Sequence, residues 1–176
     1  MQATVEDRQK LDLLFSLAYE ELRRLASSVK RSDPSATLSP TTLVNEAWLK
    51  LAKSPQIAAT SRLHFKRIAA RAMRQVLVEA ARRRSSLKRG GDFAVVTFDE
   101  FPQKPIEFGR DLLALDAALK DLAQMQPRQA LMVEGRFFGG LDVSETAQLL
   151  EVSEATVLRD WRAAKAWLAL ELRRGR

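Results

Sequence analysis

Two arginines near the end of the chain, Arg159 and Arg162, are three residues apart in a segment with a helical pattern. At that spacing they lie on one face of a helix. Small and polar residues share this face, and such a surface can approach the base edges and phosphates of duplex DNA. The residues expected to contact the duplex are Ser153, Glu154, Ala155, Thr156, Arg159, Arg162 and Lys165.

Residues 141–165 predict the two short helices that would position this face. Asp142 and Glu145 have the spacing of a capping box, and Ser153 is a cap for the second helix. The pattern is typical of a helix-turn-helix, although capped helix pairs also form ordinary bundle corners. Glu151 occupies the turn, where a left-handed conformation costs a non-glycine residue about 1 kcal/mol. The predicted apolar side of the second helix consists of Val157, Trp161, Ala164 and Leu168.

A second group of basic residues lies in a long helix predicted over 63–84. Residues 62–89 hold ten basic residues and one acidic residue, a local charge of +9, against −2 for the rest of the chain. Several arginines of this helix form a line about 20 Å long on the side opposite its own apolar residues. This line suits a phosphate backbone or an unpaired strand, and a solvated charged face is the alternative. The residues expected to contact a single strand are Arg62, Lys66, Arg67, Arg71, Arg74 and Arg82.

A third candidate surface lies on a helix predicted from the Ser39-Pro40 start to about Ala52. Its buried side has a regular apolar pattern, and its other side is polar apart from Leu49. An outward leucine among polar groups is a mild indication of a protein interface. The residues expected at this interface are Thr42, Asn45, Glu46, Leu49 and Lys53.

The composition indicates an all-α chain of two small helical domains. We expect an N-terminal helical bundle at 1–86, a flexible or extended linker at 87–110 with no convincing strand pair, and a C-terminal helix-turn-helix domain at 111–176. The chain has 176 residues, 46% of them hydrophobic, and no cysteine, so disulfides and thiolate metal sites are excluded. No apolar run could span a bilayer and the N-terminus lacks a signal-peptide pattern, which predicts a cytoplasmic protein.

The three surfaces together resemble one family, the extracytoplasmic-function (ECF) group of bacterial RNA polymerase sigma factors. Residues 43–49 (Leu-Val-Asn-Glu-Ala-Trp-Leu) are similar to the family's Asp-Leu-Val-Gln-Glu-x-Phe-Leu motif, with Thr42 and Asn45 as departures. Residues 65–84 are similar to its helix ending in a run of arginines. The resemblance covers residues 10–172 and is closer to an ECF-like subgroup than to the mainstream of the group.

The resemblance implies a function in transcription initiation. The helix at 41–51 would dock on the clamp helices of core RNA polymerase, the basic helix and the loop at 55–64 would engage the opened minus-ten strand, and the helix-turn-helix would read the minus-thirty-five duplex. Acidic residues of the linker, such as Asp92 and Asp99, would mimic nucleic acid or be solvated. Core RNA polymerase and promoter DNA are the implied partners, and an anti-sigma factor or another regulatory protein is left open.

Other function classes are less well supported. No cofactor, metal site or enzymatic activity is expected, since His64 is the sole histidine and no glycine-rich phosphate loop precedes a lysine. A stand-alone helix-turn-helix regulator that binds duplex DNA as a dimer is the main alternative. A helical scaffold or anti-sigma-type interaction module without a DNA role is a third.

Overall fold

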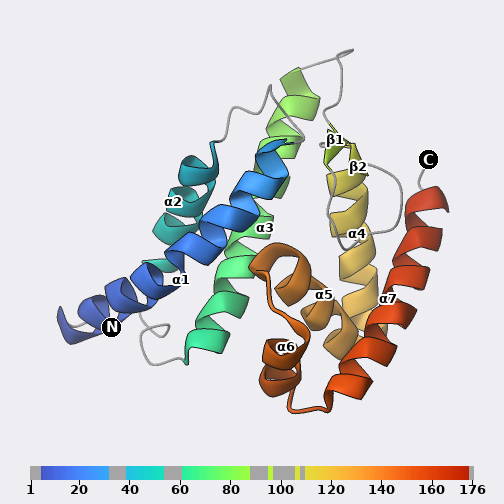
Figure 1. Ribbon diagram of the computed structural model, residues 1–176. Coiled ribbons are helices and arrows are strands. Elements are labelled where there is room, and N and C mark those ends of the chain that lie inside the picture. The colour runs from blue at the N-terminus through green and yellow to red at the C-terminus, as the bar shows by residue number, and fades with distance from the viewer. Residues whose placement is uncertain are drawn as a thin grey trace.

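The computed structural model describes residues 5–31, 39–53, 61–87, 95–96, 106–107 and 110–174 (Figure 1). Within these ranges the chain is almost entirely helical, which confirms the all-α prediction. No described helix combines the length and apolar character that crossing a bilayer requires. In chain order the elements are α1 (Val5–Arg31), α2 (Pro40–Leu51), α3 (Arg62–Leu87), β1 (Val95–Val96), β2 (Ile106–Glu107), α4 (Arg110–Met125), α5 (Pro127–Gly139), α6 (Val143–Leu150) and α7 (Glu154–Arg174).

The N-terminal half begins with α1 and α2, which pack against α3. Helix α2 starts as predicted, with Pro40 in its first turn and the Ser39 hydroxyl accepting from the Thr42 amide at 3.0 Å. The Phe15 ring of α1 stacks on the Trp48 ring of α2, with 4.3 Å between centroids. These contacts leave the opposite side of α2 exposed.

Helix α3 is longer than predicted, because it ends at Leu87 rather than at Arg84. No proline or glycine interrupts residues 85–87, and the Ser86 hydroxyl donates to the Arg83 carbonyl oxygen at 2.7 Å. That bond satisfies one of the carbonyl groups that a helix end leaves unpaired. Leu87, the first residue of the predicted linker, therefore belongs to α3.

The prediction of no strand pair is wrong. Strands β1 and β2 pair antiparallel, with Val95 opposite Glu107 and Val96 opposite Ile106. Each strand has only two residues, too few for the alternating pattern that reveals a strand in a sequence. The other linker residues, including Asp92 and Asp99, and the 54–60 part of the loop before α3 lie outside the described residues.

Four helices make up the C-terminal half, and their boundaries follow the predicted breaks. Pro127 occupies the first turn of α5, and Gly140 ends that helix in a left-handed conformation with φ 62°. Helices α6 and α7 are the predicted helix-turn-helix pair. Glu151 adopts the left-handed conformation in the turn between them, with φ 54°.

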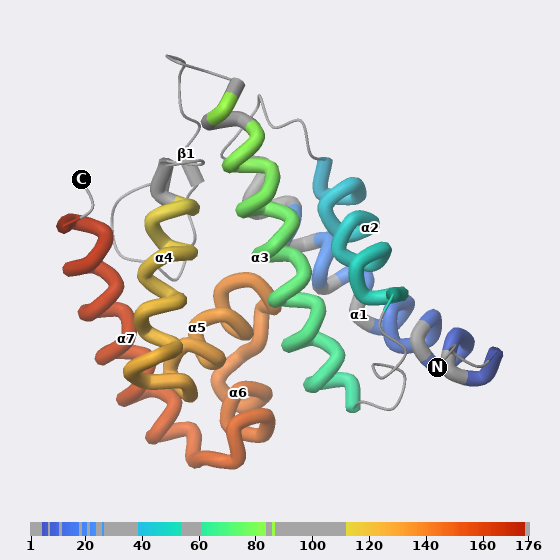
Figure 2. Tube along the Cα trace, turned by 180° about the vertical axis from the view of Figure 1, so that it is seen from behind, coloured from blue at the N-terminus to red at the C-terminus, as the bar shows by residue number. Residues whose placement is uncertain are grey.

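Helix α3 lies between the N-terminal helices and the C-terminal half (Figure 2). Its contact with α5 is the most extensive of any described pair of elements. Buried apolar side chains form one cluster that runs through both halves, including Leu43, Met73, Leu119 and Leu168. The proposed domain limits, 1–86 and 111–176, stay a prediction.

Candidate nucleic-acid interface

The start of α6 fixes the geometry of the helix-turn-helix. The Asp142 carboxylate accepts from the Glu145 amide at 2.7 Å, and the Glu145 carboxylate accepts from the Asp142 amide at 3.1 Å. This is a complete capping box, as predicted. After the turn, the Ser153 hydroxyl accepts from the Thr156 amide at 3.2 Å and caps α7.

Helix α7 exposes the face that the sequence assigns to duplex DNA. Ser153, Glu154, Ala155, Arg159 and Arg162 are exposed, and Thr156 and Lys165 are half-buried. The Arg159 side chain is 72% exposed. We call these seven residues the recognition face.

The opposite side of α7 is anchored in the core. Val157, Trp161, Ala164 and Leu168 are buried, as the helical spacing predicted. Asp160 is buried beside them, and its Oδ2 forms an ion pair with Arg128 Nη2 at 2.6 Å. These contacts fix which side of α7 points outward.

Leu158, a large apolar residue on the exposed side of α7, was not among the residues predicted to contact DNA. Leu158 is 42% exposed. It lies three residues after Ala155 and four residues before Arg162. That spacing places the three residues on one face, and it was readable from the sequence. An apolar side chain on this face can contact the methyl group of thymine.

The basic residues of α3 do not form the outward-facing line that the sequence predicted. Arg62, Arg71 and Arg82 are exposed, whereas Arg67 and Arg74 are half-buried and Lys66 is buried. The reason is that α4, α5 and α6 cover part of this side of α3. We call these six residues the basic face of α3.

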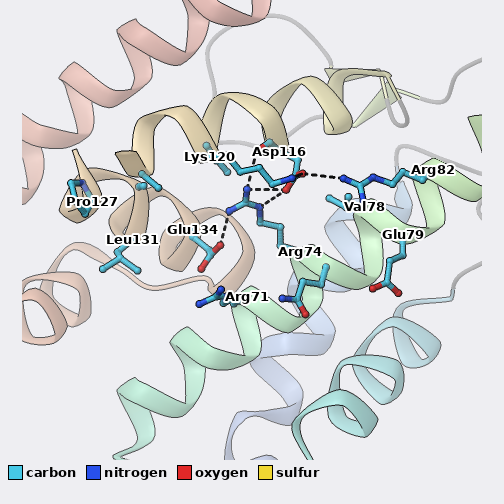
Figure 3. A pocket seen from close by; sticks show the side chains of 14 residues that line it. Arg71, Arg74, Val78, Glu79, Arg82, Asp116, Lys120, Pro127, Leu131 and Glu134 are labelled. Atoms are coloured by element: carbon cyan, nitrogen blue, oxygen red, sulfur yellow. Dashed lines mark hydrogen bonds and ion pairs between the residues drawn. The ribbon is translucent and has the colours of Figure 1, made fainter. Parts of the chain in front are cut away.

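Arg74 is held by two acidic residues of the C-terminal half (Figure 3). Its Nε donates to Asp116 Oδ1 at 3.0 Å and its Nη2 donates to the Asp116 carbonyl oxygen at 3.0 Å. Its Nη1 donates to Glu134 Oε2 at 2.7 Å. One guanidinium group thus joins α3 to both α4 and α5.

Asp116 is the most heavily paired carboxylate of this network. Besides Arg74, it contacts Lys120 Nζ at 2.8 Å and Arg82 Nη2 at 3.8 Å. Burial on its own would raise the pKa of Asp116, but the hydrogen bond from Lys120 and the charge of Arg74 outweigh it. The pKa is therefore lowered from its ordinary value of 3.8.

A second ion pair connects α3 to α6. Lys66 Nζ donates to Glu145 Oε1 at 2.7 Å, and the Lys66 side chain is only 3% exposed. The same carboxylate closes the capping box of α6 through its other oxygen. Lys66 is thus paired with the residue that starts the helix-turn-helix.

A cleft of about 470 Å³ opens between α3, α4 and α5 beside the Arg74 network. Arg71, Arg82 and Lys120 line it together with Asp116 and Glu134 (Figure 3). Its walls carry charges of both signs, so it is not a strongly cationic pocket. Among the described residues, no group of three or more His, Cys, Asp or Glu side chains could hold a metal ion.

The surface on α2 is exposed as predicted. Thr42, Asn45, Glu46, Leu49 and Lys53 all lie on the solvent side, and Leu49 is 59% exposed. The Thr42 hydroxyl is 2.8 Å from the Ser39 hydroxyl. We call these five residues the α2 face.

The structure therefore keeps the three predicted surfaces apart, on α2, α3 and α7, rather than gathering them into one pocket. The model of the family described as ECF sigma factor matches residues 2–174. The chain belongs to the ECF sigma factor family. This sigma factor directs RNA polymerase to promoters, and its partners are core RNA polymerase and promoter DNA. No match was found among curated proteins or among solved structures.

Proposed function

We propose that this sigma factor divides promoter recognition between α7 and α3 while α2 holds core polymerase. The recognition face of α7 contacts the upstream duplex, and the basic face of α3 engages the single strand after melting. The α2 face docks on the clamp helices. The observation that carries the proposal is the exposed, arginine-bearing face of α7 on a complete helix-turn-helix.

The charge distribution supports a two-point contact. The recognition face carries three cations and one acid, whereas the basic face of α3 consists of six cations. Phosphate neutralisation supplies most of the sequence-independent DNA affinity, so α7 alone is expected to bind duplex DNA weakly. Polymerase would supply the missing affinity by holding both helices against the same promoter.

Promoter melting is also consistent with this division of roles between α7 and α3. Unstacking DNA bases costs a few kcal/mol per step, so the opened strand must be captured to offset that cost. Arg71 is exposed, and Arg82 is exposed with a contact of 3.8 Å to Asp116, so both can contact phosphates with little rearrangement. Arg74 and Lys66 can do so only after they leave their carboxylate partners.

Run-off transcription with core RNA polymerase and a promoter library tests the proposal. R159A/R162A is expected to reduce promoter use at least about tenfold, since each specific base contact contributes about 1–3 kcal/mol. R173A/R174A is the matched control, because it removes the same charge from exposed residues at the far end of the same helix. The control should transcribe like the wild type.

Two results would count against the proposal. No transcript from any promoter in the library would exclude the assignment of the three surfaces to initiation. Tight binding of a palindromic duplex by a dimer without polymerase would indicate a stand-alone regulator instead.

A further inference from the structure

Leu158 places a large apolar side chain in the part of α7 that a helix-turn-helix brings nearest to the bases. It is the fifth residue of α7, and the N-terminal residues of a recognition helix contact base edges in the major groove. Its side chain is 42% exposed, whereas Val157 and Trp161 on the other side of the helix are buried. The exposure of Leu158 is therefore a property of its position and not of a loosely packed helix.

The neighbours of Leu158 on the helix surface leave its outer side accessible. Residues three or four positions apart are neighbours on a helix. Ala155, three residues before Leu158, is exposed and too small to cover it, and Arg162, four residues after it, is exposed as well. Leu158 therefore lies between a small residue and a long cation that can reach an adjacent base pair.

Arg159, the next residue in the chain, is held away from Leu158. Its Nε and Nη2 donate to Asp160 Oδ1 at 3.4 and 3.3 Å, and Asp160 Oδ2 accepts from Arg128 Nη2 at 2.6 Å. Successive residues are about 100° apart around a helix, so a contact with Asp160 holds the Arg159 guanidinium on the side away from Leu158. The surface between Ala155 and Arg162 is thus left to the leucine.

The chemistry of the major groove limits what a leucine at this position can recognise. Thymine presents its C5-methyl group there, whereas the edges of the other bases are distinguished by hydrogen-bond donors and acceptors. A leucine cannot pair with those polar groups, and removing them from water without a partner costs binding free energy. Leu158 therefore favours a thymine and disfavours the other three bases.

We propose that Leu158 is a specificity-determining residue of this sigma factor, which packs against the C5-methyl group of a thymine in the upstream promoter element. The proposal rests on the contact between α7 and the upstream duplex proposed above, and it adds one base to that contact. Four residues of helix span about 6 Å and adjacent base pairs are about 3.4 Å apart. The thymine is thus expected within about two base pairs of the base that Arg162 contacts.

Selection from a promoter library tests for this thymine. The library is randomised over about one helical turn of the upstream element and is bound by holoenzyme assembled from core RNA polymerase and the full chain. The wild type should enrich thymine at one position, and L158A should lose that preference. L170A is the matched control, since Leu170 is a 54% exposed leucine further along the same helix, and it should select like the wild type. No thymine enrichment by the wild type, or equal enrichment by L158A, would overturn the proposal.

Replacing the selected thymine by uracil isolates the methyl group, because the two bases differ only there. Burying one methyl group corresponds to about a fourfold change in affinity. Wild-type holoenzyme should therefore bind the uracil promoter about fourfold more weakly than the thymine promoter, and L158A should bind both equally. L158M should keep the preference, because methionine fills a similar volume. If L158A weakens binding of both promoters by the same factor, Leu158 does not contact the methyl group and the proposal is wrong.

The arginine variants separate this proposal from the proposed function. If R159A/R162A reduces promoter use but the wild type does not distinguish thymine from uracil, the assignment of Leu158 is wrong and the division of roles between α7 and α3 stands. If the wild type distinguishes them through Leu158 but R159A/R162A transcribes like the wild type, the leucine contact stands and the assignment of the two arginines is wrong.

Discussion

Replacing Arg74 by methionine tests how much the ion-pair network between α3, α4 and α5 stabilises the fold. The Arg74 side chain is 14% exposed, and those of Asp116 and Glu134 are each 10% exposed. Methionine fills most of the volume of the arginine stem, so R74M mainly removes charge and hydrogen bonds. The change therefore leaves two nearly buried carboxylates without their shared partner.

The expected loss of unfolding free energy depends on the ion-pair partners that each carboxylate retains. Removing one member of a buried ion pair typically costs about 3–5 kcal/mol, because the other charge stays buried without compensation. Asp116 retains Lys120 at 2.8 Å, whereas Arg74 is the only partner of Glu134 among the described residues. We therefore expect R74M to lower the unfolding free energy by about 3 kcal/mol, the lower end of this range. In a protein of this size, that lowers Tm by roughly 6–12 °C.

Urea denaturation followed by circular dichroism measures this loss. R71M is the matched control: it lies one turn earlier on α3, is exposed, and should change stability by less than about 0.5 kcal/mol. In R74M/E134Q the stranded Glu134 charge is gone, so part of the loss should be recovered. An R74M loss below about 1 kcal/mol, the range of exposed ion pairs, would refute the reasoning. So would a double variant less stable than R74M.

Three further predictions concern single residues of the C-terminal half. Because the pKa of Asp116 is lowered in the folded protein, its stabilising contribution is present above its ordinary pKa of 3.8 and is lost as the pH falls through the folded value. Unfolding free energy should therefore fall less steeply below pH 3.8 in D116N than in the wild type, and parallel curves would contradict this. D142A should lose about 1 kcal/mol with the capping box, whereas the nearby exposed variant S144A should lose nothing in urea denaturation. E151G should gain up to about 1 kcal/mol by relieving the left-handed conformation, and Q148G, inside α6, should lose about as much.

Local structure was largely predictable from the sequence, because helix starts depend on residues three or four positions apart. Ser39 with Pro40, and Asp142 with Glu145, start α2 and α6 where the patterns placed them. The buried side of α7 was predictable for the same reason, since its stripe repeats at helical spacing.

The contact between the two halves was not predictable, because its partners are far apart in the chain. Arg74 meets Asp116 and Glu134 across 42 and 60 positions, and Lys66 meets Glu145 across 79. The periodicity of α3 distinguishes an apolar side from a charged side, and it predicts that the charged side faces solvent. The covering of that side by α5 depends on small residues such as Ala70 and Gly139, which carry no strong signal.

The two oxygens of the Glu145 carboxylate have separate partners, the Asp142 amide and the Lys66 ammonium group. A glutamine at this position keeps an oxygen for the helix start but loses the charge that attracts Lys66. A single Glu-to-Gln exchange thus removes the ion pair between α3 and α6 while the capping box of α6 is kept. The side chain at position 145 therefore couples the start of the helix-turn-helix to α3, so one substitution there changes how the pair α6–α7 is attached without changing the residues exposed on α7.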